Sequence, residues 1–177
     1  MSRSVLLLAC LSAWGATLER LSLDEMTARS TAIVRARAQA SSGVLIGSTI
    51  YTRTRFQVLE RWKGAEAAEV DVFQPGGTTG GVTQSYIGVP RFSAGQEVVL
   101  FLWTGPSGRT QVIGLSQGVF QVERNRSEEA QAVREPSSEV MLAPGTGERL
   151  VDQSIRMPLG RLGARLRAVT ERDRRPQ

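Results

Sequence analysis

The sequence predicts a mainly β fold: a small five- to six-stranded OB-like barrel, with a short N-terminal helix and a C-terminal helix packed on it. Three observations predict it. Stretches of alternating polar and apolar residues recur between positions 31 and 123, and glycine or proline interrupts them about every ten residues. The most apolar stretch, Gln96–Trp103, has six apolar residues in succession. A two-sheet sandwich is the alternative that this pattern allows.

A short helix is predicted to begin at Ser22. Ser22 and Glu25 have the spacing of a capping box, in which the serine hydroxyl accepts from the third amide and the glutamate reaches back. Asp24 and Glu25 also suit the positive end of the helix dipole. The helix should end near Arg29-Ser30, where β-branched residues take over.

Two strands with one polar face each are predicted next. Thr31–Ala40 alternates between alanine or valine and polar residues, so we expect a half-exposed strand followed by a turn at Ser41–Gly43. From Ile50 to Val58, even-numbered residues lie on one face, and the other face carries Tyr51, Arg53, Arg55 and Gln57. Leu59–Gly64 should end this strand.

Glu69–Phe73 alternates again, with Val70 and Val72 directed inward. Gln74–Gly81 (QPGGTTGG) should be a wide glycine-rich turn. Further strands are predicted over Thr83–Ile87, Gln96–Trp103, Thr110–Leu115 and Gly118–Glu123, with breaks at Gly88-Val89-Pro90 and Thr104–Gly108. Gln96–Trp103 is apolar on both faces and is therefore predicted to be the central, fully buried strand.

The last third of the chain is predicted to leave the barrel and return. Residues 125–155 are polar and form a long excursion, with one short strand at Gln131–Arg134. Residues 156–172 should be a helix, since leucine and valine recur at spacings of three and four. Gly160 and Gly163 weaken that helix by about 1 kcal/mol each, so we expect it to form only when docked on the sheet.

The first fifteen residues, Met1–Gly15, have the pattern of a secretory signal peptide. Arg3 provides the positive start, Val5–Leu11 the apolar centre, and Ala13-Trp14-Gly15 a small-x-small cleavage site. We therefore expect an extracytoplasmic protein, periplasmic or secreted, with residues 16–177 forming a single domain. No stretch of the sequence approaches the roughly 18 apolar residues that a transmembrane helix needs.

Cys10 is the only cysteine, and the sequence has no histidine. A lipoprotein acylated at Cys10 and a buried N-terminal helix are the two alternatives to a cleaved signal peptide. In each case no intrachain disulfide can form, and histidine-dependent catalysis and histidine-ligated zinc are excluded. We expect no cofactor and no metal.

The net charge of +5 resides entirely in residues 156–177, where seven arginines face two acidic residues. The rest of the chain is neutral, which argues against nucleic acid as a partner. The arginine run 161–175 is typical either of a segment that meets anionic lipid or cell-wall polymer, or of a docked helix with a solvated outer side. The carboxylate pairs Asp24-Glu25, Glu66 with Glu69, and Glu128-Glu129 lack the placement of a glycosidase pair.

Several motifs carry a resemblance to known proteins. They are Ile50–Gly64 (IYTRTRFQVLERWKG), Pro75-Gly76-Gly77, Gly88-Val89-Pro90 with Phe92, Gly95–Leu102, and Gln117–Phe120. Across Leu23–Val122 the chain resembles a group of uncharacterised secreted bacterial proteins and the netrin-like domains, the OB-type barrels of tissue inhibitors of metalloproteinases. Those inhibitors use an N-terminal cysteine and several disulfides, which this chain lacks, so the resemblance implies their fold but not their inhibitory mechanism.

The candidate ligand face is the polar side of the strand that begins at Ile50, with the glycine turn beside it. Its residues are Tyr51, Arg53, Arg55, Trp62, Gly76 and Gly77. Arg35 and Arg37 on the neighbouring strand could extend it, or all these arginines could form a solvated face. Likewise, Gly76–Gly81 could cradle a phosphate, but it lacks the lysine of a P-loop and is more typical of a turn.

The sequence therefore predicts an exported, non-catalytic binding domain for another secreted protein or a cell-surface polymer. No catalytic set of residues emerges, whereas the fold pattern is complete. A small extracytoplasmic hydrolase that uses carboxylates and arginines brought together by folding is the alternative, and a protease-inhibitor-like module is a third interpretation. The oligomeric state is left open.

Overall fold

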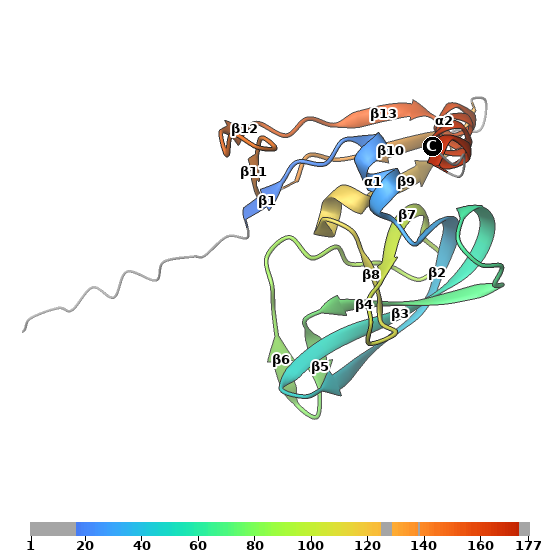
Figure 1. Cartoon of the computed structure of the whole chain (residues 1–177). Coiled ribbons are helices and arrows are strands. Elements are labelled where there is room, and N and C mark those ends of the chain that lie inside the picture. Colours follow the sequence, from blue (N-terminus) through green and yellow to red (C-terminus); the bar gives the residue numbers. More distant parts are fainter. Residues whose placement is uncertain (1–16, 125–128, 138, 174–177) are drawn as a thin grey trace, which may run out of the picture.

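A computed structural model describes residues 17–124, 129–137 and 139–173 of the chain. The predicted signal peptide, Met1–Gly15, and Cys10 lie outside these residues. Figure 1 shows a curled sheet with a smaller layer of strands and both helices above it. The elements are β1 (Thr17–Glu19), α1 (Leu23–Arg29), β2 (Ala32–Ile46), β3 (Thr49–Lys63), β4 (Glu69–Pro75), β5 (Gly77–Thr79), β6 (Val82–Gln84), β7 (Glu97–Thr104), β8 (Thr110–Val112), a 3₁₀ turn (Leu115–Gly118), β9 (Val119–Glu123), β10 (Gln131–Arg134), β11 (Val140–Leu142), β12 (Arg149–Leu150), β13 (Ile155–Pro158) and α2 (Leu159–Asp173).

The main sheet runs in the order β13-β10-β9-β7-β2-β3-β4, and β8 pairs with β7. All of its pairings are antiparallel. One edge of β7 pairs with β2, while its other edge pairs with β9 at Val98–Leu100 and with β8 at Leu102–Thr104. The chain is thus mainly β with a C-terminal helix, as predicted.

Strands β8, β7, β2, β3 and β4 curl round so that β8 comes to lie against β4. Among the described residues, no backbone hydrogen bond joins β4 to β8, and we call the gap between them the seam. The hydrogen-bonded sheet is therefore open there, not a closed barrel. Two features limit closure: β8 is only three residues long, and the chain turns away at Gly114, whose φ is +60°.

The sheet separates two apolar cores. The first lies inside the curl and contains Val34, Ala36, Ala38, Phe56, Val72, Val98, Leu100 and Leu102. The second lies between the other face of the sheet and the two helices, and it contains Met26, Ile33, Trp62, Val99, Phe101, Phe120, Leu162 and Leu166. Consecutive β7 residues alternate between the two cores, so the prediction that this strand is buried on both faces is confirmed.

Both helices form, with boundaries set by local chemistry. Helix α1 has the predicted capping box, because the Ser22 hydroxyl accepts from the Glu25 amide and the Glu25 carboxylate accepts from the Ser22 amide. Helix α2 begins at Leu159, three residues later than predicted, because Ile155–Pro158 pair with β10 as strand β13. Its apolar face consists of Leu159, Leu162, Leu166 and Val169, as the spacing predicted.

Three local predictions were wrong. Ser41–Gly43 are not a turn, because β2 continues to Ile46 and the Ser41 and Thr54 hydroxyls are 2.8 Å apart across the pair. Gln74–Gly81 is not a wide turn: β4 extends to Pro75, and β5 and β6 form a short hairpin. The short strand predicted at Gln131–Arg134 is confirmed as β10, but the polar stretch 125–155 is not an excursion elsewhere, since it also supplies β11 and β12.

The described part of the polar stretch 125–155 contains a buried ion pair. The Arg134 guanidinium donates to the Asp152 carboxylate at 2.7 Å, and both side chains are 2 % exposed. Asp152 also accepts from the Ser137 amide at 2.8 Å. None of the helices that the structure describes is long and apolar enough to span a membrane.

Candidate functional site

Three of the predicted site residues lie together on the outer face of β3. Tyr51, Arg53 and Arg55 alternate with buried Ile50, Thr54 and Phe56. Arg55 is already engaged, because its guanidinium donates to the Asp71 carboxylate at 2.9 Å. That hydrogen bond holds the pKa of Asp71 below its usual range and raises the pKa of Arg55.

The remaining predicted residues serve structural roles or lie elsewhere. Trp62 is 7 % exposed and packs beneath α2 in the second core, apart from Tyr51 and Arg53. Gly76 and Gly77 have φ values of +93° and +135°, and a Cβ on Gly77 would lie 2.5 Å from the Thr52 hydroxyl. These glycines allow the β4–β5 connection to pass close to β3. Since Trp62 lies in the second core and the glycines have this structural role, the six predicted residues are not gathered into one site.

Two arginines of α2, Arg165 and Arg167, and Arg35 of strand β2 are also held by neighbours. Arg165 donates to Asp24 at 3.0 Å, and Arg167 lies 3.4 Å from Glu60. Arg35 and Arg124 both donate to Glu97, at 2.9 and 2.8 Å. Burial raises the pKa of Glu97, but the hydrogen bonds from Arg124 and Arg35 outweigh it and lower the net value.

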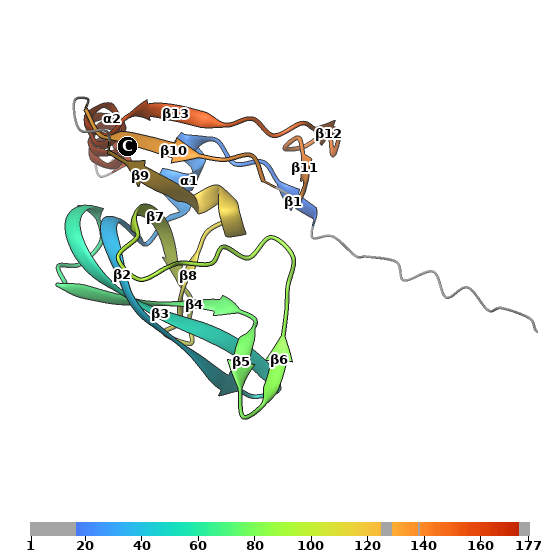
Figure 2. The same ribbon diagram turned by 180° about the vertical axis from the view of Figure 1, so that it is seen from behind.

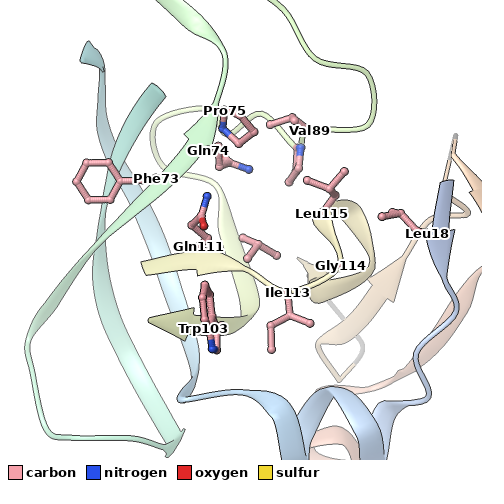
Figure 3. A pocket seen from close by; sticks show the side chains of 12 residues that line it. Leu18, Phe73, Gln74, Pro75, Val89, Trp103, Gln111, Ile113, Gly114 and Leu115 are labelled. Carbon is pink, nitrogen blue, oxygen red and sulfur yellow. The ribbon is translucent and has the colours of Figure 1, made fainter. Parts of the chain in front are cut away.

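A pocket of about 350 Å³ opens at the seam. We call it the seam pocket; its lining comes from β1, β4, β7, β8, the segment between β6 and β7, and the residues that follow β8, as Figure 3 shows. Its walls are Leu18, Phe73, Gln74, Pro75, Val89, Pro90, Trp103, Gln111, Val112, Ile113, Gly114 and Leu115. No charged residue is among them, and the volume lies in the range of small-ligand sites.

Gln74 is the unusual member of this pocket. It follows Val70 and Val72 on the inward face of β4 and is only 4 % exposed. Its Nε2 is buried and has no hydrogen-bond acceptor among the described residues. Figure 3 shows this nitrogen directed toward the side of the pocket that carries Val89, with the Gln111 carboxamide extending toward Gln74 from β8. A buried donor without an acceptor costs about 1–3 kcal/mol, so its retention requires an explanation.

A second, smaller pocket of about 230 Å³ adjoins the first. We call it the inner pocket; it shares Gln74, Pro75, Val89 and Pro90 with the seam pocket. Its other walls are more polar and include Ser41, Thr52, Thr54, Tyr86 and Arg91. The two pockets are neighbours with the four shared residues as common walls: the seam pocket is mainly apolar, the inner pocket is more polar, and Gln74 lines both.

The segment between β6 and β7 covers these two pockets. It crosses the end of the curl, as Figures 1 and 2 show. Phe92 anchors it, because its ring meets Phe56 edge-on at 4.9 Å inside the first core. Gly88 anchors it from the other side, where a Cβ would lie 1.1 Å from Glu139 Oε1. Val89 and Pro90 are thus held over Gln74 from both ends.

Other chemistries find less support in the described residues. No carboxylate lines either pocket, and no group of three or more histidine, cysteine, aspartate or glutamate side chains is placed to hold a metal there. Glu139 is buried beside Ser116 and Ser137, whose hydroxyls are 2.9 Å apart, but this cluster belongs to the anchor of the covering segment. Sequence reasoning missed Gln74, although its even spacing from Val70 and Val72 placed it inside.

No family model, curated protein or solved structure matches this chain. The netrin-like resemblance therefore stays a prediction from the sequence motifs.

Proposed function

We propose that this chain is an exported, non-catalytic binding domain whose ligand places an uncharged apolar group in the seam pocket. The five curled strands act in this proposal as an OB-like barrel left open at one seam. The observation that carries the proposal is Gln74, a buried amide donor without an acceptor in a pocket that has no charged wall. A ligand carbonyl that accepts from Nε2 would remove the cost of the unmade hydrogen bond.

The shape and chemistry of the walls define the group that would fit. Proline, valine, leucine and isoleucine side chains make most of the surface, which favours a ring or a branched aliphatic group. Trp103 is 44 % exposed at the rim and gives a flat surface for stacking. Because Nε2 is covered by the Val89–Pro90 segment, the ligand carbonyl would reach it by a small displacement of that segment.

A neutral model compound tests the proposal. N-acetyl-L-phenylalaninamide has an apolar ring, two carbonyls and no charge. We expect it to shift the NMR resonances of the Gln74 side-chain amide and the Trp103 indole with saturation at millimolar concentration. Gln74→Leu should abolish the titration, whereas Gln57→Leu, the same change on the exposed face of β3, should leave it intact.

Two results would contradict the proposal: no response at Gln74, or equal binding by Gln74→Leu. The carboxylate-dependent hydrolase, the alternative from the sequence, would use a different pocket of about 230 Å³, whose lining includes Glu60, Glu129, Arg35, Arg124 and Arg167. The Glu60 carboxylate is already paired there with Arg35 and Arg167. Turnover of acyl or glycosidic model substrates by the wild-type protein would nevertheless support that alternative over a binding role.

A further inference from the structure

We infer that the ligand is the C-terminal residue of another polypeptide, with an apolar side chain in the seam pocket and its carboxylate on Arg91 in the inner pocket. This inference rests on the proposed function, because it uses the same Gln74 donor. It goes further by assigning a charge and a direction to the ligand.

Arg91 supplies the charge argument. It lines the inner pocket and makes no ion pair or hydrogen bond with any side chain in the described part of the chain. Most arginines near the curl are held instead, as Arg55 is by Asp71 and Arg35 is by Glu97. A guanidinium at the mouth of a pocket matches a carboxylate with two parallel hydrogen bonds.

The other polar groups of the inner pocket leave Arg91 as the principal site for an anion. The Ser41 and Thr54 hydroxyls bond to each other at 2.8 Å, and the Thr52 hydroxyl donates to the Gly76 carbonyl at 2.8 Å. Neither pocket contains an acidic residue that would repel a carboxylate. The seam pocket takes an apolar group, Gln74 takes a carbonyl beside it, and Arg91 takes a negative charge in the inner pocket. An apolar C-terminal residue offers these three groups around one Cα, which carries the side chain and the carboxylate and is joined through its nitrogen to the carbonyl of the preceding residue.

Exposed apolar side chains favour a polypeptide over a free acid. Tyr86 lines the inner pocket and is 48 % exposed, Ile87 follows it at 54 %, and Trp103 borders the seam pocket. Tyr86 and Ile87 at the inner pocket, and Trp103 separately at the seam pocket, offer the preceding residues of a peptide exposed apolar side chains to contact.

The experiment compares two peptides that differ only in charge, N-acetyl-Ala-Ala-Phe with a free carboxylate and the same peptide with a C-terminal amide. We expect the acid to bind about fivefold more tightly at low salt, a difference within the range of a partly exposed ion pair. Arg91→Gln should remove this preference, while Arg53→Gln on the outer face of β3 should preserve it. Sodium chloride should reduce the preference in the wild type.

The outcomes separate the two claims. Equal binding of both peptides, with the Gln74 amide shifted in each case, would overturn the C-terminal inference and leave the proposed function standing. A free acid, N-acetyl-L-phenylalanine, that binds as tightly as the acidic peptide would also overturn it, since the preceding residues would then contribute nothing. Failure of both peptides and of the neutral probe would overturn the proposed function itself.

Discussion

The Glu139 carboxylate occupies the space that a side chain on Gly88 would need. A Cβ at position 88 would lie 1.1 Å from Glu139 Oε1, and the φ of Gly88 is +80°. Glu139 itself is buried. This contact ties the segment over the two pockets to the layer formed by β1, β11 and β12, so that the cover and the pocket walls are positioned together.

Gly88→Ala should therefore destabilise the protein by more than its backbone strain alone. Gly95→Ala is the matched control, because Gly95 has a φ of +84° and no atom within 4 Å of its Cβ position. Because alanine is strained in the left-handed conformation, each change should lower the free energy of unfolding by about 1–2 kcal/mol. The collision with Glu139 should lower it by about 1 kcal/mol more at Gly88. Urea unfolding gives both values. Adding Glu139→Ala to Gly88→Ala should recover the extra loss; equal costs at the two glycines would contradict this contact.

The two glycines of α2 should respond in opposite directions to alanine. Gly163→Ala places a Cβ 3.0 Å from Trp62 Nε1, and that indole is buried, so we expect a lower melting temperature. Gly160→Ala meets only the end of the Glu129 side chain, which is exposed, and should stabilise the helix by about 0.5–1 kcal/mol. Trp62→Phe should relieve Gly163→Ala. Stabilisation by both alanines would show that α2 is not docked on Trp62.

The Glu97 cluster predicts a loss of stability in acid. Because the native pKa of Glu97 lies below its ordinary value of 4.5, the ionised form contributes stability above that value. The contribution disappears as the pH falls from about 4.5 through the lowered native pKa. Glu97→Gln should lower the free energy of unfolding at pH 7 by about 1.5–3 kcal/mol. The difference from wild type should shrink below pH 4.5.

Glu123→Gln is the control for that measurement, since Glu123 pairs with Arg156 at 2.9 Å but is 48 % exposed. It should change stability by less than about 1 kcal/mol at either pH. A Glu97→Gln curve parallel to wild type between pH 7 and strong acid would contradict the assignment of this acid dependence to Glu97.

Removing only one member of the Arg134–Asp152 pair should lower the free energy of unfolding much more than removing both charges. Arg134→Met leaves the Asp152 carboxylate buried at 2 % exposure without its cation, and we expect a loss of about 3–5 kcal/mol. Arg134→Met with Asp152→Asn removes both charges and keeps an acceptor for the Ser137 amide, so much of the loss should return. Urea unfolding of the three proteins decides this. A double variant no more stable than the single one would mean that the cost does not come from the unpaired charge.

The elements that could be predicted are those with strong local patterns. Ser22 and Glu25 cap α1 through residues three apart, and the short apolar run at Val98–Leu102, rich in valine, favours a strand buried on both faces. The outer side of β3 follows from strict alternation around Tyr51, Arg53 and Arg55. In each case the information lies within a few consecutive residues.

The features that could not be predicted depend on pairing across the chain. Ser41 looks like a turn residue, yet Thr54 on β3 satisfies its hydroxyl inside the curl. Charged residues such as Arg134 and Asp152 are typical of an exposed loop in the sequence, but in the fold they form an ion pair in the interior. Gln74 precedes a proline and two glycines, so it looked like the start of a turn. Only the approach of β8 to β4 turns it into the wall of a pocket.

The most direct test is the stability of Gln74→Leu with and without N-acetyl-L-phenylalaninamide. If Nε2 of Gln74 is a buried donor without an acceptor in the free protein, the free energy of unfolding of Gln74→Leu in buffer alone should be about 1–3 kcal/mol higher than that of the wild type. Saturating compound should stabilise the wild type and leave the variant unchanged. A less stable Gln74→Leu, or one that the compound still stabilises, would contradict the binding role of the seam pocket.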